Sequence, residues 1–482
     1  MMNLKSLAKD TAIYGLSSIV GRFLNYLLVP LYTYKIAAES GGYGIVTNLY
    51  AYSALLLCLL TFGMETTFFR FSGKEGQDSD KVYGTALRLV GGVVAAFWIC
   101  VFFFLRSISS SLGYASHPEY IACFALISGM DAVQAIMFSR LRQMHRPLRF
   151  MALKMTFIVL NIAMNLFIFL VMPKFSALAS IYDSFDGGVG LIFFANLLCT
   201  FVVSLLFASE YKFFAQWGGG ELARKMLRYS FPLLLLSLVG ILNQVADKIL
   251  FPYLLPGPEG KVQLGIYGAC VKLAMIMALI TQAFRYAYEP IIFASRESSR
   301  EENLSVGTKY FVLFSMLAWL AVMVYMPLLR YFIQPGYWEG LKVVPIVMAA
   351  EIFMGVYFNL SFWYKLTDKT WWGAFLSAVG AGVMIAINVI FVPKVGYMAC
   401  AWGGFGGYLV AMLLSYFIGR RYYPIKYDLK VMGSFTLLAV IFYFIYMQVE
   451  RWQPSQWISL SIGTVFVIAF IYFIYREIRK EK

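Results

Sequence analysis

Residues 188–209 read GVGLIFFANLLCTFVVSLLFAS, a run of 22 residues without a charged side chain. A bilayer core about 30 Å thick is crossed by a helix of about 20 mostly apolar residues, because each residue advances the helix by about 1.5 Å. The stretch is therefore predicted to be a membrane-spanning helix. Because many such apolar runs occur along the chain, they decide the fold class.

Similar apolar runs fill the chain of 482 residues, which is 61% hydrophobic and only 13% charged. Soluble domains carry about twice that share of charge. The predicted spans are 11–33, 43–66, 85–106, 118–139, 150–172, 188–209, 230–252, 264–285, 308–329, 342–364, 371–393, 396–419, 431–449 and 456–475. The chain is thus predicted to be an all-α polytopic membrane protein with about 14 transmembrane helices, within a range of 12 to 14.

Positive charge collects in every second gap between these spans. About 26 Lys and Arg residues lie on the side that includes both termini, and about 8 lie on the opposite side. Basic loops remain in the cytoplasm during insertion, so both termini are predicted to be cytoplasmic. This topology and contact with anionic membrane lipids account for the net charge of +15, and no nucleic-acid partner is expected.

The sequence repeats a six-helix unit. Tyr43-Gly44-Ile45-Val46 recurs as Leu264-Gly265-Ile266-Tyr267, and Met172-Pro173-Lys174 recurs as Val392-Pro393-Lys394 at nearly the same offset along the chain. An even number of helices gives two lobes in a parallel pseudo-twofold repeat, for which substrate is expected at the interface of the lobes. The predicted domains are an N-terminal lobe (1–212), a C-terminal lobe (213–428), and two additional helices with a cytoplasmic tail (429–482).

Short motifs in both repeats resemble those of a known transporter family. In the first lobe they are Gly41-Gly42-Tyr43-Gly44, Leu59-Leu60-Thr61-Phe62-Gly63-Met64-Glu65 and Phe69-Arg70, and in the second they are Phe284-Arg285-Tyr286-Ala287-Tyr288-Glu289-Pro290 and Asn388 with Pro393-Lys394-Val395-Gly396-Tyr397. These stretches resemble the Wzx-type oligosaccharide flippases of the multidrug/oligosaccharidyl-lipid/polysaccharide superfamily. The resemblance implies a multi-pass protein of the bacterial inner membrane. It also implies transport of undecaprenyl-diphosphate-linked oligosaccharide repeat units, including those of lipopolysaccharide, from the cytoplasmic to the periplasmic leaflet.

Several charged and amide side chains fall within predicted spans, where a cation costs about 2.5–3.5 kcal/mol. Such residues are expected to line a wet cavity that accepts a lipid diphosphate, or to neutralise one another locally, as adjacent Asp247 and Lys248 would. Near the cytoplasmic ends, Glu65 is expected to pair with Arg70 and Glu289 with Arg285. The candidate cavity residues are Arg22, Asn25, Asn243, Gln244, Asp247, Lys248, Lys272 and Arg285.

Asp131 and Glu351 lie in the middle of the fourth and tenth spans, which correspond in the repeat. A protonatable carboxylate inside a membrane is a candidate relay for H⁺ or Na⁺, and the alternative is a structural acid that is neutral or ion-paired.

The sequence carries no motif for a cofactor, a metal or a catalytic group. Gly260-Lys261 is followed by Val262 and lacks the preceding glycine of a phosphate-binding loop. His117 and His145 are the only histidines, and the six cysteines contain no CxxC pair. No cofactor, metal or enzymatic activity is therefore expected.

Alternating-access transport of a lipid-linked oligosaccharide is the predicted function, with glycan-polymerase machinery as a candidate partner. A lipid II or multidrug exporter on the same scaffold is the first alternative. A membrane polysaccharide polymerase or ligase is the distant one, since such enzymes resemble many-span proteins with a large periplasmic loop. The longest outside loop expected here spans only 173–187.

Overall fold

The computed structural model describes residues 20–480 with gaps at 22, 25, 74–76, 295–296 and 453–454, and the described residues are helices and their connections. Thirteen helices among them are long and apolar enough to cross a membrane. They match the predicted spans from 43–66 to 456–475 one by one. About half of the first predicted span, 11–33, lies outside the described residues, and α2 (Leu28–Lys35) covers its end.

The described residues form two compact units. Unit 1 holds those up to Ile36 together with Ile45–Ile249, and unit 2 holds Ala37–Gly44 together with those from Leu250 onward. The predicted lobe boundaries at 212 and 428 stay predictions.

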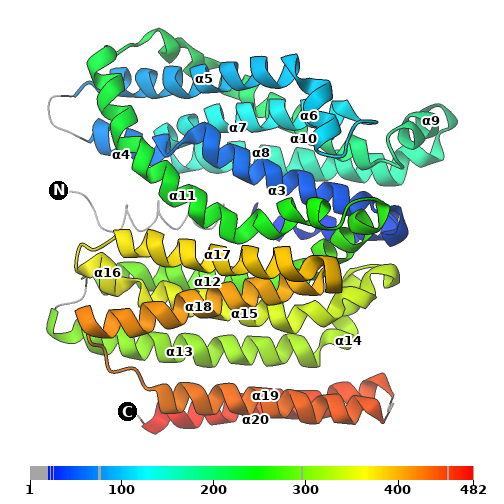
Figure 1. Ribbon diagram of the computed structural model, residues 1–482, viewed down its shortest axis with the longest axis vertical. Coiled ribbons are helices and arrows are strands. Elements are labelled where there is room, and N and C mark those ends of the chain that lie inside the picture. Colours follow the sequence, from blue (N-terminus) through cyan, green and yellow to red (C-terminus); the bar gives the residue numbers. More distant parts are fainter. Residues whose placement is uncertain are drawn as a thin grey trace. The chain divides into compact units, whose positions relative to one another are not determined.

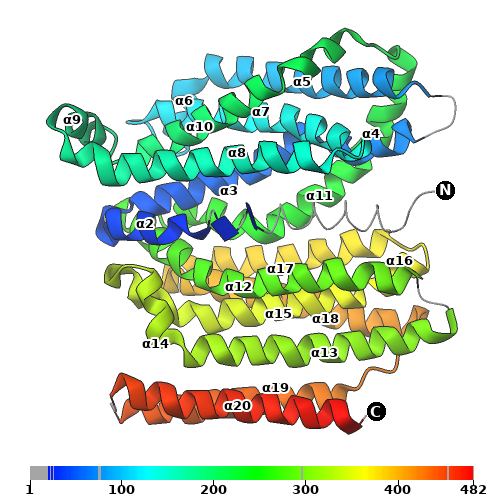
Figure 2. The same cartoon turned by 180° about the vertical axis from the view of Figure 1, so that it is seen from behind.

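Unit 1 is built from long helices joined by short ones (Figures 1 and 2). Its helices are α2 (Leu28–Lys35), α3 (Gly42–Thr61), α4 (Met64–Ser72), α5 (Ser79–Phe103), α6 (Leu105–Ser111), α7 (Pro118–Gln143), α8 (Pro147–Leu166), α9 (Ser176–Ser184), α10 (Val189–Leu206) and α11 (Gly220–Leu254). A π-helical turn (Phe167–Val171) and a 3₁₀ turn (Met172–Lys174) follow α8, and a 3₁₀ segment (Ala208–Ala215) follows α10.

Unit 2 is also built from long helices joined by short ones. Its helices are α12 (Pro258–Ala294), α13 (Glu297–Val324), α14 (Met326–Leu329), α15 (Val344–Leu360), α16 (Phe362–Leu366), α17 (Trp371–Val395), α18 (Met398–Tyr422), α19 (Leu429–Arg451) and α20 (Gln456–Lys480). Short 3₁₀ segments span Ala38–Ser40, Arg330–Phe332 and Pro335–Val343. The predicted appendage, 431–475, corresponds to α19 and α20, which lie side by side next to α13 (Figures 1 and 2).

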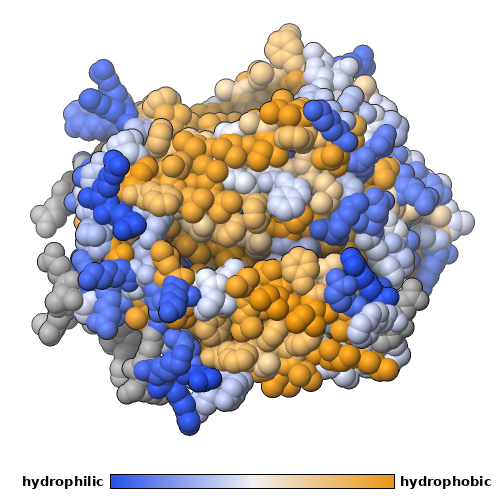
Figure 3. Space-filling model, turned by 60° about the horizontal axis from the view of Figure 1, so that its bottom comes forward, coloured by the Kyte–Doolittle hydropathy of each residue, from blue (hydrophilic) through white to orange (hydrophobic). Residues whose placement is uncertain are grey.

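The outward faces of the long helices are apolar. On α19 and α20, Leu437, Phe444, Val465 and Ile468 are each more than half exposed. Figure 3 shows a broad apolar area between two hydrophilic margins on the face that includes these helices. Water would penalise such an area, whereas lipid chains cover it, so the exposed side chains match a polytopic membrane protein.

The repeat seen in the sequence recurs as matched hydrogen bonds inside each unit. The indole nitrogen of Trp98 on α5 donates to the carbonyl oxygen of Ala125 on α7 (2.8 Å). In unit 2, Trp319 on α13 donates to the carbonyl oxygen of Pro345 on α15 (3.0 Å). The two donors, like the two acceptors, are separated along the chain by the offset of the sequence repeat. The two units therefore hold their third and fourth spans together by the same contact.

Gly44 and Gly265, the first landmarks of the repeat, also have a packing role. A Cβ on Gly44 would lie 1.9 Å from the carbonyl oxygen of Lys261 and 3.1 Å from the backbone nitrogen of Gly265. Both obstacles are backbone atoms, which cannot rotate away as a side chain can. Glycine is therefore required where the start of α3 meets α12.

We expect Gly44→Ala to destabilise the protein by at least about 2 kcal/mol, because the added methyl group overpacks a backbone contact. Gly404→Ala on α18 is the matched control, since its Cβ would meet nothing within 4 Å. That change should be neutral or stabilising, because alanine favours a helix. Thermal unfolding of the purified protein in detergent measures both. Equal melting temperatures for the two variants would contradict the packing role.

Candidate functional site

The polar residues predicted on the seventh span lie on α11 in unit 1. Lys248 Nζ contacts both carboxylate oxygens of Asp247, at 3.0 and 3.1 Å, and donates to the carbonyl oxygen of Gln244 (3.1 Å). The Asn243 amide donates to the carbonyl oxygen of Val239 (3.0 Å), and the Gln244 side chain is exposed. The adjacent opposite charges thus form a local ion pair within the helix, which is the charge neutralisation that the sequence offered as one reading.

A chain of hydrogen bonds fixes this ion-paired turn to the rest of unit 1. Asn48 on α3 donates its amide to the carbonyl oxygen of Lys248 (2.8 Å). The hydroxyl of Tyr114 donates in turn to the Asn48 amide oxygen (2.8 Å). Asn48 is buried, so it holds a defined position against α11 at the level of the ion pair.

Two candidate residues, Arg22 and Asn25, lie outside the described residues. Lys272 lies half-buried in the first half of α12, within unit 2. The remaining candidate on this helix, Arg285, lies in its second half and takes part in a charged cleft.

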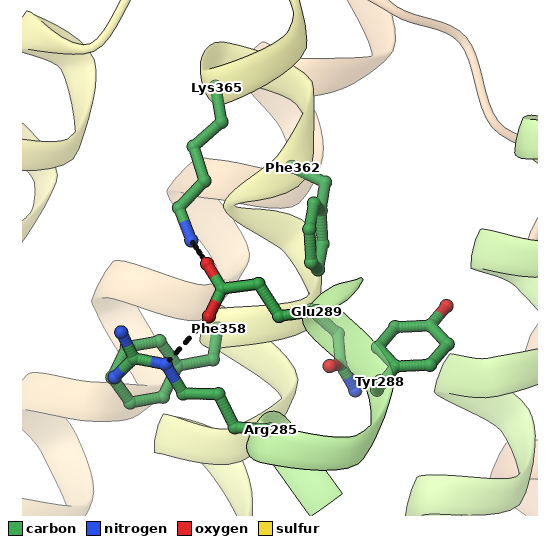
Figure 4. Close-up of a pocket in the computed structure, with 7 residues that line it drawn as sticks. Arg285, Tyr288, Glu289, Phe358, Phe362 and Lys365 are labelled. Atoms are coloured by element: carbon green, nitrogen blue, oxygen red, sulfur yellow. Dashed lines mark hydrogen bonds and ion pairs between the residues drawn. The ribbon is translucent and has the colours of Figure 1, made fainter. Parts of the chain in front are cut away.

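That cleft brings together side chains from α12, α15 and α16. Lys365 Nζ lies 3.0 Å from one carboxylate oxygen of Glu289, and Arg285 Nε lies 3.4 Å from the other. Figure 4 shows both cations pointing toward the carboxylate, with the Phe358 ring against the guanidinium. The cleft is small and partly open, and it is lined by Arg285, Tyr288, Glu289, Phe358, Asn359, Phe362 and Lys365.

Unit 1 contains a simpler counterpart of this arrangement. Glu65 on α4 accepts hydrogen bonds from Arg142 (2.9 Å) and from Ser139 (3.1 Å) on α7. Glu65 and Glu289 are separated along the chain by nearly the repeat offset, and so are Arg142 and Lys365. The two ion pairs therefore correspond in the repeat.

One predicted pair is wrong. Glu289 does pair with Arg285, but Glu65 pairs with Arg142 instead of Arg70. Arg70 lies with its guanidinium 4.1 Å from the centre of the Tyr229 ring. The physical reason is helix geometry, because α7 brings Arg142 to the face of α4 that carries Glu65, whereas Arg70 contacts α11.

The two candidate relay acids have different surroundings. Asp131 on α7 interacts electrostatically with Lys154 on α8, and the Thr200 side chain lies near its carboxyl group. Lys154 is an exposed residue, and its ammonium group lies 4.1 Å from the centre of the Phe138 ring. Glu351 is half-buried at the middle of α15.

Adding the repeat offset to position 154 gives position 375, which is Phe375 on α17. The cation beside Asp131 therefore has no equivalent at that position of the second repeat, so the two acids differ in their electrostatic setting.

A buried charge network was missed from the sequence, which placed Arg140 in a cytoplasmic loop. Arg140 is only 6% exposed and lies between the Tyr83 and Phe213 rings, with its guanidinium 4.2 and 4.0 Å from their centres. It pairs with Asp80 (2.7 Å) and with buried Glu210 (3.7 Å). Nothing in the sequence separates Arg140 from the other cations nearby, because the burial depends on the segment that follows α10.

Comparison with known proteins decides the family. The family described as polysaccharide biosynthesis protein matches residues 7–295, more than half of the chain. The chain belongs to the polysaccharide biosynthesis protein family. Among curated proteins, none matches the sequence at a significant level.

Solved structures show which fold this member of the polysaccharide biosynthesis family has. The lipid II flippase MurJ in an inward closed conformation is 16% identical, with a TM-score of 0.72, over 98% of this chain and 99% of that one. An inward-facing multidrug resistance MATE family transporter of the MOP superfamily is 17% identical, with a TM-score of 0.65, over 83% and 93%. A MATE protein in the straight conformation is 16% identical, with a TM-score of 0.55, over 86% and 95%.

These likenesses show the fold of this family member: a polytopic all-α membrane protein of the MurJ and MATE type. The family match and this fold agree with the family and the fold class that the motifs and the apolar runs predicted.

The contacts of Asp131 and Lys154 predict a non-additive effect on stability. Asp131→Asn removes one of the two carboxylates, Asp131 and Glu65, that interact with the Lys154 ammonium, and it should lower the melting temperature by on the order of 5 °C. Adding Lys154→Met to that variant should restore most of the loss, because both charges are then gone. Thermal unfolding of the parent, the two single variants and the double variant measures this effect. Arg106→Met, at an exposed site on α6, is the control. Additive losses in the double variant would show that the two charges act independently.

Proposed function

We propose that the chain is a flippase that moves undecaprenyl-diphosphate-linked oligosaccharide units across the bacterial inner membrane by alternating access. The observation that carries this proposal is the match of residues 7–295 to a polysaccharide biosynthesis family on a chain with the flippase fold. A unit that is assembled on a lipid diphosphate in the cytoplasm must cross the membrane before it can be polymerised outside. A glycan polymerase would then receive the product.

The proposed substrate has a negative diphosphate that must pass a medium of low dielectric constant. Cations inside the membrane lower that barrier, since arginine binds phosphate with a planar fork and lysine with a point charge. We assign this role to Lys272 and Arg285 on α12, to the Asp247–Lys248 turn with Asn243 and Gln244 on α11, and to Arg22 and Asn25. The prenyl tail needs no such path, because it can remain in lipid.

Orientation follows from the distribution of positive charge. With about 26 basic residues on the side of the termini and about 8 opposite, both termini are proposed to be cytoplasmic. Substrate would then enter at the ends of the helices that carry Glu65, Arg142, Glu289 and Lys365.

Asp131 and Glu351 are the proposed coupling residues. A carboxylate that alternates between a dry and a wet setting can take up and release H⁺ or Na⁺. Lys154 beside Asp131 provides a second charge that competes with such an ion. In the second repeat, Phe375 stands at the position that corresponds to Lys154, so Glu351 has no lysine at that position. Glu351 is therefore the stronger candidate for the coupling residue.

A lipid II flippase is the second candidate function, and one observation favours it. MurJ covers 98% of this chain, including α19 and α20, whereas the MATE transporter covers 83%. Lipid II also carries a prenyl diphosphate, so the cations described above would serve either substrate. A multidrug exporter is the third candidate and would favour cationic compounds over diphosphates.

Transport in proteoliposomes tests the proposal. Vesicles containing the full chain receive a fluorescent prenyl-diphosphate oligosaccharide, lipid II or a cationic dye, and an impermeant quencher reports which leaflet holds the label. We expect the oligosaccharide lipid to move fastest. Lys272→Gln should slow it at least about tenfold, whereas Lys272→Arg, which keeps the charge, should retain most of the rate. Arg106→Gln on α6 is the control and should match the parent.

Faster movement of lipid II or of the dye would replace the proposed substrate. The same vesicles with an imposed H⁺ or Na⁺ gradient test coupling, which Glu351→Gln should abolish without abolishing substrate binding. A gradient response like that of the parent in both Glu351→Gln and Asp131→Asn would make the two acids structural.

A further inference from the structure

The charged cleft in unit 2 has more hydrogen-bond donors than its own residues use. Lys365 Nζ and Arg285 Nε contact the two oxygens of Glu289 (Figure 4). The terminal nitrogens of Arg285 donate to no side chain or carbonyl in the described part of unit 2. The Arg285 side chain is 47% exposed, so its guanidinium is accessible to a ligand from outside the cleft.

Aromatic side chains hold the cations in place. The Arg285 guanidinium carbon lies 4.4 Å from the centre of the Phe358 ring, and Lys365 Nζ lies 5.1 Å from that of Phe362. Stacking on a ring fixes the plane of a guanidinium and leaves its edge available. The donors of Arg285 are therefore oriented before any ligand arrives.

Asn359 provides a second and independent observation. Its side chain lines the cleft and is only 4% exposed, and its amide nitrogen has no acceptor among the described residues. Burying an unsatisfied amide donor typically costs about 1–3 kcal/mol, so proteins rarely leave one without a reason. An acceptor oxygen bound in the cleft would satisfy it.

Comparison of the two repeats shows which residues of the cleft have a counterpart in unit 1. Glu65 and Arg142 in unit 1 form the equivalent of the Glu289–Lys365 pair. Counting back from Arg285 by the spacing that joins Glu289 to Glu65 leads to Thr61, which carries no charge. A shared plan of helix packing therefore explains the pair in both units but does not explain Arg285 in unit 2.

We propose that this cleft binds a phosphate-bearing headgroup, and that Glu289 occupies its two cations until the phosphate arrives. With one carboxylate and two cations, the cleft has a net charge of +1 and favours an anion. A phosphate group offers enough oxygens for the Arg285 fork, for Lys365 and for the Asn359 amide together. Glu289 competes for the same cations, so bound phosphate is released once Glu289 returns to them.

The phosphate can belong to a membrane lipid or be free in solution. That it belongs to the transported lipid rests on the proposed function, whereas anion binding in the cleft does not. Binding measured without transport separates the two claims.

Isothermal titration of the full chain in detergent tests the proposal with three probes: inorganic phosphate, short-chain phosphatidic acid and a short-chain prenyl diphosphate. Glu289→Gln removes the competing charge and should tighten binding about tenfold. Arg285→Gln should weaken it about tenfold, and Asn359→Leu should weaken it by a smaller factor. Arg142→Gln, which changes the counterpart pair in unit 1, is the matched control and should bind like the parent.

A gain of affinity in Glu289→Gln cannot arise from misfolding, so it keeps the test decisive even if Arg285→Gln is unstable. Tightening for the two lipid probes alone assigns the site to a headgroup, and tightening for inorganic phosphate as well assigns it to phosphate from either source. Unchanged or weaker binding of every probe to Glu289→Gln would overturn the proposal. If the variants bind the probes as expected but the oligosaccharide lipid is not transported, the proposed function is wrong and the anion site stands.

Discussion

The interior of a lipid bilayer offers no water to a polar group, and this constraint governs the whole chain. A helix forms its backbone hydrogen bonds within itself, so the backbone polar groups of the thirteen described spans need no water. Charged side chains must find partners within the protein. Lys248 contacts the neighbouring Asp247 on the same helix, Arg142 joins α7 to α4 through Glu65, and Arg140 lies beside Glu210. Each pair avoids the cost of an isolated charge, and the pairs between elements also fix one against another.

The repeat shows which of these contacts belong to the scaffold. Trp98 and Trp319 make the same hydrogen bond in their own units, and Glu65 and Glu289 accept equivalent cations. Contacts found twice are most simply explained by helix packing. Differences between the units, such as Arg285 and the lysine beside Asp131, are where specific functions are to be sought.

Much of this fold could be predicted from the sequence. Apolar runs located the thirteen described spans, since helix length in a membrane is set by bilayer thickness, but α11, α12 and α13 begin 6 to 11 residues earlier than predicted. The short helices α6 and α9 and the π-helical turn after α8 were not foreseen, because they are too short or too local to leave a hydropathy signal. The family motifs pointed to this family and the apolar runs to an all-α membrane fold, in agreement with the family match and the solved structures.

Pairing of side chains was harder to predict than helix positions. Which partner a charge meets depends on how far each helix is rotated about its own axis, and hydropathy does not report that rotation. Proximity in the sequence therefore predicted the wrong partner for Glu65. It predicted the right partner for Asp247, because Lys248 is its neighbour in the chain. Lys365 could have been found from the repeat, because it lies about one repeat offset after Arg142. Arg140 could not, since its burial requires the segment that follows α10.

We propose a fourteen-span topology of two parallel six-helix lobes and two further helices, with the basic loops in the cytoplasm. The sidedness of the two ends tests it most directly, because an even number of spans places both termini on one side. In a variant without the six native cysteines, single cysteines at Ser6 and Glu481 would be labelled in intact cells and in inverted membrane vesicles with an impermeant thiol reagent. The account predicts that both positions react only in inverted vesicles. Labelling of either position in intact cells would contradict the topology and the transport direction that follows from it.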